Sequence, residues 1–326
     1  MTTVVAACYG GPEVLKIVQR DKPPITENDV RVRVVAASAN PLDWHYLRGS
    51  PYLMRLMSGL GTPNDTSVGV DFAGVVDAVG VNVTEFQPGD RVFGGVGGAF
   101  GEFVVRAQDR AIAHIPEGVS FEQAAAVPIA GVTALQALRQ GNLQPGQSVL
   151  INGASGGVGT FAVQIAKAMG ADVTGVCSTR NVEMVLSIGA DQVVDYKTAD
   201  FTTLDERYDL IIDNVGNHSV SALTGVLNPA GSLVVVGASK GDWIAPFMGV
   251  LNILVSRPFS DFALHTLLAE LRQQDLIHLA TLMGQGQVRS VIDRRFDLQD
   301  VVAAIEYSET GRARGKIIVN VAGGNN

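Results

Sequence analysis

A glycine-rich segment at residues 148–159 constrains the fold of this chain more than any other feature. It reads Ser-Val-Leu-Ile-Asn-Gly-Ala-Ser-Gly-Gly-Val-Gly, and apolar residues at three- and four-residue intervals follow it as far as Met169. The order is therefore strand, glycine turn and helix, which is the context of a dinucleotide-binding fingerprint. A pyrophosphate must approach backbone N–H groups at a helix N-terminus, and larger side chains would block it. We expect the cofactor to contact Ala154, Ser155, Gly156, Gly157 and Val158.

The segment departs from the strict G-x-G-x-x-G pattern, because two residues separate Gly153 from Gly156, so its context carries the prediction. That context repeats: residues 171–177 predict a strand, a helix follows as far as Ile188, and residues 190–196 predict another strand. Apolar strands are also expected at residues 209–214 and 232–237. The pattern predicts an α/β fold with a doubly wound parallel sheet. The strand ends expected to border the cofactor are Asn214, Val215, Gly237 and Ala238.

The residues after the second strand indicate which nicotinamide cofactor is used. An Asp or Glu at this place binds the ribose hydroxyls of the unphosphorylated form, but the chain has Ser178, Thr179 and Arg180. Hydroxyl groups and a guanidinium suit a 2′-phosphate, so we predict NADPH, with Tyr196 and Lys197 completing the phosphate pocket. The alternative for Arg180 is a solvated residue at a helix start.

Composition excludes several other classes of protein. The net charge is −8 with no basic run, which argues against a nucleic-acid partner. Only Cys8 and Cys177 are present, so no disulfide framework is expected and a cytoplasmic location is predicted. Residues 1–8 are read as a first strand and not as a signal peptide. The apolar residues 244–255 are too few and too interrupted to span a membrane; an apolar substrate site, a subunit contact and an ordinary core helix stay open for them.

The periodicity changes along the chain and predicts three parts. Residues 30–34 alternate strictly and Pro88-Gly89-Asp90 forms a turn, as in a β-rich domain. Residues 121–139 are helical, and after residue 262 we expect a helix, a strand at 291–296, a helix at 298–308 and a strand at 316–321. We therefore predict a β-rich domain at residues 1–122, a nucleotide domain at 123–260 and a segment at 261–326 that returns to the first domain.

Further motifs extend over nearly the whole chain. They are residues 9–15 (Tyr-Gly-Gly-Pro-Glu-Val-Leu), 39–43 (Ala-Asn-Pro-Leu-Asp), 69–76 (Gly-Val-Asp-Phe-Ala-Gly-Val-Val), 88–94 (Pro-Gly-Asp-Arg-Val-Phe-Gly) and 314–319 (Arg-Gly-Lys-Ile-Ile-Val). With the glycine turn, these motifs make the chain resemble the medium-chain dehydrogenase/reductase superfamily, in particular its zinc-independent quinone oxidoreductases and alkenal or enone reductases. The resemblance implies a GroES-like catalytic domain, a Rossmann NADPH-binding domain and a homodimer.

The resemblance also bears on zinc. Zinc-binding members carry Cys where this chain has Asn40, His where it has Val70, and a further ligand near Pro128. None of these three residues supplies the sulfur or nitrogen that zinc prefers, and two cysteines cannot form a four-cysteine structural lobe. The five histidines show no ligand spacing. We therefore expect no metal.

Without a Lewis acid, oxidation of simple alcohols is poorly supported, whereas hydride transfer to a quinone or to the C=C of an α,β-unsaturated carbonyl compound needs only positioning and a proton. The resemblance places Asn40, Asp43 and Thr133 near the nicotinamide. The candidate proton donors are His45, Tyr46 and Tyr52, and Lys316 is a weaker cofactor candidate. A surface role for His45 stays open, as do two other functions: an enoyl-thioester reductase and a non-catalytic, crystallin-like or regulatory NADPH-binding protein.

Overall fold

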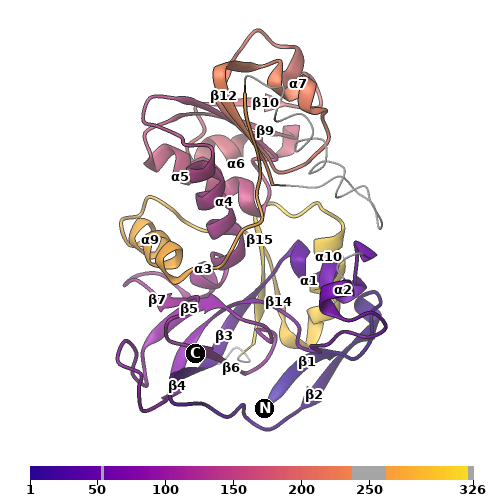
Figure 1. Ribbon diagram of the computed structural model, residues 1–326, viewed down its shortest axis with the longest axis vertical. Helices are drawn as coiled ribbons and strands as arrows, with labels where there is room; N and C mark the ends of the chain where they lie inside the picture. Colours follow the sequence, from indigo (N-terminus) through magenta and orange to yellow (C-terminus); the bar gives the residue numbers. More distant parts are fainter. Residues whose placement is uncertain (53–54, 237–261, 322–326) are drawn as a thin grey trace. The chain divides into compact units, whose positions relative to one another are not determined.

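The computed structural model describes residues 1–52, 55–236 and 262–321. The chain forms two compact units (Figure 1). Unit 1 contains Met1–Val132, Leu271–Gly286 and Ser290–Asn326, and unit 2 contains Thr133–Glu270 and Gln287–Arg289. The division falls inside helix α4 (Pro128–Gln140), and the chain rejoins unit 1 at Leu271. Unit 2 overlaps the nucleotide domain that the sequence predicts at residues 123–260.

Unit 1 is built on a seven-stranded sheet in which the strand order is β14-β15-β3-β4-β5-β7, with β6 also paired to β3. The strands are β3 (Asp29–Ala39), β4 (Asp71–Val79), β5 (Arg91–Gly95), β6 (Phe103–Ala107), β7 (Ile112–His114), β14 (Ile292–Asp297) and β15 (Lys316–Asn320). All pairs are antiparallel except β14 with β15. A separate antiparallel pair joins β1 (Thr2–Ala6) and β2 (Leu15–Gln19). The expected β-rich domain is confirmed.

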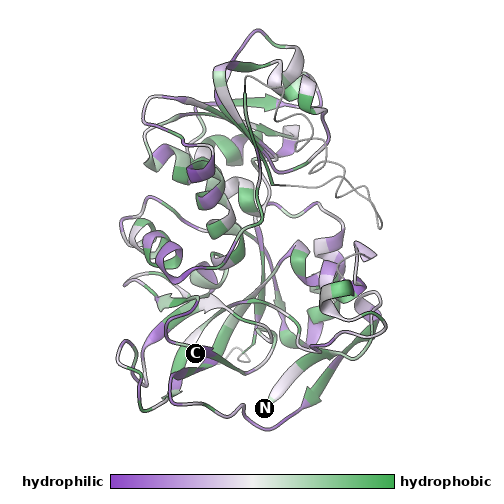
Figure 2. Ribbon diagram, viewed as in Figure 1, coloured by the Kyte–Doolittle hydropathy of each residue, from purple (hydrophilic) through white to green (hydrophobic). Residues whose placement is uncertain are grey.

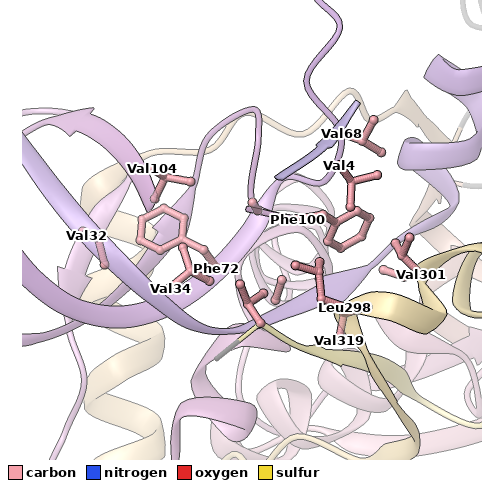
Figure 3. Close-up of a cluster of buried hydrophobic side chains, with 14 of the residues drawn as sticks. Val4, Val32, Val34, Val68, Phe72, Phe100, Val104, Leu298, Val301 and Val319 are labelled. Atoms are coloured by element: carbon pink, nitrogen blue, oxygen red, sulfur yellow. The ribbon is translucent and has the colours of Figure 1, made fainter. Parts of the chain in front are cut away.

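Strand β3 shows why these residues form this sheet. Val30, Val32 and Val34 are buried, whereas Arg31 and Arg33 between them lie on the other face. Successive strand residues point to opposite faces, so the alternation gives the strand one apolar face. Burying each valine stabilises the fold by roughly 1.5–3 kcal/mol. These valines join a core with Phe72 of β4 and residues from the first and last parts of the chain (Figure 3).

The helices of unit 1 are mostly short. They are α1 (Pro41–Arg48), α2 (Arg55–Ser58), α3 (Phe121–Ala125), α9 (Gln273–Gly284) and α10 (Val301–Glu309), with 3-10 turns η1 (Pro12–Val14) and η6 (Leu298–Asp300). The C-terminal strand β15 lies between β14 and β3 (Figure 1), with Ile317 beside Ala39. The first and last segments of the chain therefore form one core.

Unit 2 is a six-stranded, wholly parallel sheet in which the strand order is β10-β9-β8-β11-β12-β13. The strands are β8 (Ser148–Asn152), β9 (Asp172–Cys177), β10 (Gln192–Asp195), β11 (Tyr208–Asp213), β12 (Leu227–Val235) and β13 (Ala263–Thr266). The order is 3-2-1-4-5-6 in chain sequence, that of the doubly wound dinucleotide-binding fold, and the expected sheet is confirmed. Its central strands are apolar and buried (Figure 2). The order reverses between β8 and β11, where such sheets bind ligands.

The helices of unit 2 include α5 (Gly157–Ala168), α6 (Val182–Ser187) and α7 (Val220–Thr224), with 3-10 turns η3 (Thr179–Asn181) and η4 (Phe201–Thr203). In α5 the eight residues from Gly159 to Ala166 are all buried. The sequence predicts one apolar face, but Gln164 also turns inward, where its amide bonds the backbone N–H and C=O of Arg289. Gly170, at φ +82°, follows the end of the helix, as expected.

One element differs from the sequence prediction. The chain was expected to be helical from residue 262, but Ala263–Thr266 forms strand β13, which pairs with Ser232–Val235 at the edge of the sheet. A short apolar run does not distinguish helix from strand, and here it pairs with β12 as a strand. Helix α9 begins only at Gln273. The apolar segment at 244–255 lies outside the described residues, as do Gly237 and Ala238.

Candidate functional site

The glycine turn joins β8 to α5 in a conformation that side chains would obstruct at two positions. Gly153 has φ +79°, and a Cβ there would lie 2.8 Å from Val215 Cγ2. A Cβ on Gly159 would lie 2.1 Å from the carbonyl oxygen of Gly153. A Cβ on Gly156 would meet only that oxygen, at 3.4 Å. Gly153 and Gly159 are therefore required for packing, whereas the space beside Gly156 is open.

The N-terminus of α5 suits an anion. Gly156 is its N-cap, no side chain caps it, and its first turn contains no acidic residue. The first N–H groups of a helix lack intrahelical acceptors and carry partial positive charge. Ser155, Gly156, Gly157 and Val158 are partly exposed, but the Ala154 N–H already donates to Val176 O at 3.0 Å. The open space and these donors fit a pyrophosphate, with Ala154 serving the turn itself.

The loop after β9 is tied to the glycine turn by a residue that the sequence analysis did not select. Asn181 Nδ2 donates to Ser155 Oγ at 2.9 Å and to Ser178 Oγ at 3.2 Å, and Asn181 is only 5% exposed. Thr179 and Arg180 are exposed beside it. The structure thus brings together Ser155 and Ser178, two of the predicted cofactor residues.

The next strand brings a carboxylate to the same loop. Thr179 Oγ1 donates to Asp195 Oδ2 at 2.5 Å, and Asp195 Oδ1 accepts from the Lys197 N–H at 2.9 Å. The hydrogen bond from Thr179 lowers the pKa of Asp195, so this group is ionised at neutral pH. Tyr196 is exposed, with Lys197 Nζ 5.3 Å from its ring centre. No acid ends β9, as predicted, but Asp195 ends β10 and was not among the predicted cofactor residues.

Polar residues gather where β8 and β11 end side by side. Asn152 Nδ2 donates to Asp213 Oδ1 at 2.8 Å, and the same oxygen accepts from the Val215 and Gly216 N–H groups at 3.0 Å each. Asn214 Nδ2 donates to Asn152 O at 3.0 Å. These bonds hold the predicted residues Asn214 and Val215 at the switch point of the sheet, with Val215 43% exposed. Thr133, also predicted, is buried in α4.

Unit 1 contains a buried charged network around Lys316. Its ammonium donates to Asn40 Oδ1 at 2.5 Å and lies 3.4 Å from Asp71 Oδ2, and Asn40 Nδ2 donates to the same Asp71 oxygen at 2.9 Å. Asp71 Oδ1 accepts from the Ile129 N–H at 3.0 Å. Lys316 was predicted to contact cofactor, but it is 3% exposed and its ammonium is directed at these two side chains. We therefore reassign it to an internal role.

Asp43 lies beside this network and caps α1. Its Oδ2 accepts from the Asn40 N–H at 2.7 Å. Burial, partly opposed by that hydrogen bond, raises the pKa of Asp43 to about 7. Burial also lowers the pKa of Lys316 and raises that of Asp71, because each charged form loses its hydration. Asn40 and Asp43 are thus held inside unit 1.

The three predicted proton donors lie on α1 and just after it. His45 Nδ1 lies 2.9 Å from Ser50 O, and the ring stacks on Trp44. A carbonyl oxygen only accepts, so Nδ1 carries the proton of this hydrogen bond. Tyr46 is exposed. Tyr52 stacks on the guanidinium of Arg55, 4.6 Å from its ring centre.

Comparisons with known proteins agree with this architecture. The alcohol dehydrogenase GroES-like domain family matches residues 26–117, and the zinc-binding dehydrogenase family matches residues 188–319. A trans-enoyl reductase from Aspergillus terreus is 35% identical, over 90% of this chain and 86% of that protein. The chain belongs to the medium-chain dehydrogenase/reductase superfamily.

Two solved structures of quinone oxidoreductases of this superfamily resemble the whole chain. The Coxiella burnetii enzyme is 32% identical with a TM-score of 0.87, covering 98% of this chain and 99% of that one. The Escherichia coli enzyme, solved in complex with NADPH, is 27% identical with a TM-score of 0.81, covering 98% of this chain and 100% of that one. The resemblance seen in the motifs is therefore confirmed.

The superfamily has zinc-binding members, so the three positions named for zinc ligands matter. Asn40 has its side chain committed to Lys316, Asp71 and Ser38 O, Val70 is half-buried, and Pro128 begins α4. In the described parts of the chain, no three His, Cys, Asp or Glu side chains are grouped as metal ligands would be. No described helix is long and apolar enough to cross a membrane.

Proposed function

We propose that this protein is an NADPH-dependent reductase that passes a hydride to a quinone or to the C=C of an α,β-unsaturated carbonyl compound. The observation that carries the proposal is the open, uncapped N-terminus of α5 beside Gly156, at the switch point of the parallel sheet. The quinone oxidoreductase names of its relatives support the acceptor class, and the NADPH complex of the E. coli relative supports the cofactor.

The residues of unit 2 would hold the cofactor. The N–H groups at the start of α5 and the Ser155 hydroxyl would bind the pyrophosphate. Ser178, Arg180 and Lys197 would bind the 2′-phosphate, because a hydroxyl and two cations complement it. When bound, the reduced nicotinamide supplies the hydride. The backbone of Asn214 and Val215 would line its approach.

A protein side chain would supply the proton. We assign this role to His45, an imidazole on α1 whose ring is oriented by the hydrogen bond from Nδ1 to Ser50 O. An enolate oxygen or carbon must be protonated before product leaves, whereas a hydroquinone takes its protons from water more readily. His45→Ala should therefore lower kcat for an enone more than tenfold, with little change for a quinone. Equal and small effects on kcat for both acceptors would exclude His45 as the proton donor and leave Tyr46 or Tyr52 as candidates.

A second candidate function is enoyl-thioester reduction, favoured by the trans-enoyl reductase from A. terreus. The two functions use the same chemistry and differ in the acceptor. A series of enones and enoyl thioesters of increasing chain length separates them, because an acyl-chain enzyme gains kcat/KM with each buried methylene. A non-catalytic role predicts saturable NADPH binding with no turnover of any acceptor.

The assay that tests the proposal is NADPH oxidation, followed by absorbance, with a quinone and an enone offered separately and NADH as the control cofactor. Turnover that is faster with NADPH supports it. Saturable NADPH binding without turnover of either acceptor contradicts it. Sedimentation and cell fractionation test the homodimer and the cytoplasmic location, which stay predictions.

A further inference from the structure

The 2′ position of the cofactor ribose would meet a carboxylate that the second strand does not provide. In a doubly wound sheet the acid that accepts from the ribose hydroxyls ends the second strand, which here is β9. Strand β9 ends in Cys177 followed by Ser178. The neighbouring strand β10 ends in Asp195, directly beside Cys177 in the sheet register. Asp195 therefore lies at the same end of the sheet as the last residue of β9, but it belongs to the neighbouring strand β10.

The bonds of Asp195 fix its position in the loop. Its Oδ2 accepts from Thr179 Oγ1 at 2.5 Å, two residues beyond the end of β9. Its Oδ1 accepts from the Lys197 N–H at 2.9 Å, and its carbonyl accepts from the Thr198 and Ala199 N–H groups. These contacts hold the carboxylate on the loop that carries Ser178 and Arg180.

The hydroxyls of this loop and of the neighbouring glycine turn consequently have opposite roles. The Ser155 and Ser178 oxygens accept from Asn181 Nδ2, so their own protons can be donated to an anion. Thr179 donates its proton to Asp195, so its oxygen can only accept. Ser178 and Arg180 therefore favour a phosphate, whereas the Thr179–Asp195 pair favours a hydroxyl.

We infer that Asp195 is a specificity-determining residue whose carboxylate limits the preference for NADPH and lets the site accept NADH. The inference rests on the proposed function, because it concerns the same cofactor site. The Asp195 charge opposes a 2′-phosphate, and with Thr179 it offers acceptors to a 2′-hydroxyl. The cationic groups Arg180 and Lys197 act in the other direction on the same loop.

The test uses Asp195→Asn, which keeps an oxygen for the Lys197 N–H while removing the charge. Binding of 2′,5′-ADP and 5′-AMP is measured by calorimetry on the full chain, and kcat/KM is measured for NADPH and NADH. We expect 2′,5′-ADP to bind roughly 3- to 10-fold more tightly, with no gain for 5′-AMP. The gain should shrink as the salt concentration rises.

The matched control is Asp172→Asn, which removes a charge at the opposite end of β9. At about 3.3 Å per strand residue, this position is beyond one Debye length from the loop at physiological salt. It should leave both affinities unchanged. Asp195→Ser provides a second neutral variant if Asp195→Asn folds poorly, which circular dichroism shows.

The outcomes separate this inference from the proposed function. If wild type prefers 2′,5′-ADP and Asp195→Asn changes both ligands equally or neither, the inference is overturned while the proposed cofactor stands. If wild type prefers 5′-AMP and Asp195→Asn still shifts selectivity toward 2′,5′-ADP, the NADPH assignment fails and the inference is supported.

Discussion

Lys316 carries the most deeply buried positive charge among the described residues of unit 1, and its partners explain why it is tolerated. Its ammonium lies against Asn40 and Asp71, while Asp43 caps the adjoining helix. A buried ion pair is costly to form, but removing one member is costlier because it leaves the other buried charge without a countercharge.

Lys316→Met should therefore destabilise the protein by about 3–5 kcal/mol. Asp71→Asn should also destabilise it, and the double variant should recover much of the loss, because no unpaired charge is left. Urea unfolding of the three variants and wild type measures this cycle. Strictly additive losses would show that the pair is not coupled.

The raised pKa of Asp43, about 7, predicts a pH dependence of stability. Between pH 4 and pH 7 the folded protein retains a proton that the unfolded chain has lost, so the free energy of unfolding falls as pH rises. Asp43→Asn removes this dependence and can still accept from the Asn40 N–H. The variant should match wild type near pH 4 and exceed it by a few kcal/mol at pH 8. Denaturant unfolding across this range checks the sign, and a pH-independent difference contradicts it.

Sequence reasoning at this scale found residues that lie close to a recognisable motif and missed those that arrive from elsewhere. Ser155 and Ser178 were predicted because each follows a strand in the βα pattern. Asn181 and Asp195 were missed because their contacts depend on which strands become neighbours. Lys316 was assigned to the cofactor because nothing local shows its pairing with Asn40, 276 positions away.

Among the elements, the glycine turn has two roles, packing against the rest of the fold and leaving space for the cofactor. Different glycines of the turn serve each role. Gly156→Ala should fold normally, because its Cβ would meet no atom closer than 3.4 Å, yet it fills space at the start of α5. We expect unchanged stability, within about 0.5 kcal/mol, and roughly tenfold weaker NADPH binding.

Gly159→Ala is the counterpart, because its Cβ would lie 2.1 Å from Gly153 O. It should destabilise the fold by about 1–3 kcal/mol and weaken binding as well. Thermal unfolding and NADPH titration of both variants test the distinction. Identical behaviour of the two would contradict it.

Most elements could be predicted from periodicity and turn residues, including β8, α5, β9 and the parallel sheet. Strand β13 could not, because a short apolar run does not distinguish helix from strand and its pairing with β12 is not visible in the sequence. The burial of α5 on all sides could not be predicted either. Gln164 is polar, and it is buried because its side chain bonds the backbone of Arg289, which is distant in the sequence.

At the scale of the whole molecule, the chain returns to its beginning: β15 pairs with β3 and completes the core of unit 1. The change of periodicity along the chain predicts this returning segment at residues 261–326, whereas composition alone excludes other classes of protein without giving the fold. Asn40, Val70 and Pro128 stand where zinc-binding members of the superfamily carry their ligands. We therefore predict that catalysis needs no zinc.

Dialysis against a strong chelator should therefore leave kcat and the unfolding temperature unchanged. Elemental analysis of the active, dialysed protein should find less than stoichiometric zinc. Loss of activity that returns on adding zinc would contradict the assignment.

The proposed function rests on direct hydride transfer from NADPH to the acceptor. Its most direct test is single-turnover oxidation of NADPH deuterated at C4, with each epimer used in turn against a quinone and an enone. We predict that oxidation slows with one epimer only, and that the enone product from that epimer gains the deuterium. Bound NADPH that is not oxidised, or oxidation insensitive to both labels and without deuterium in the product, would contradict it.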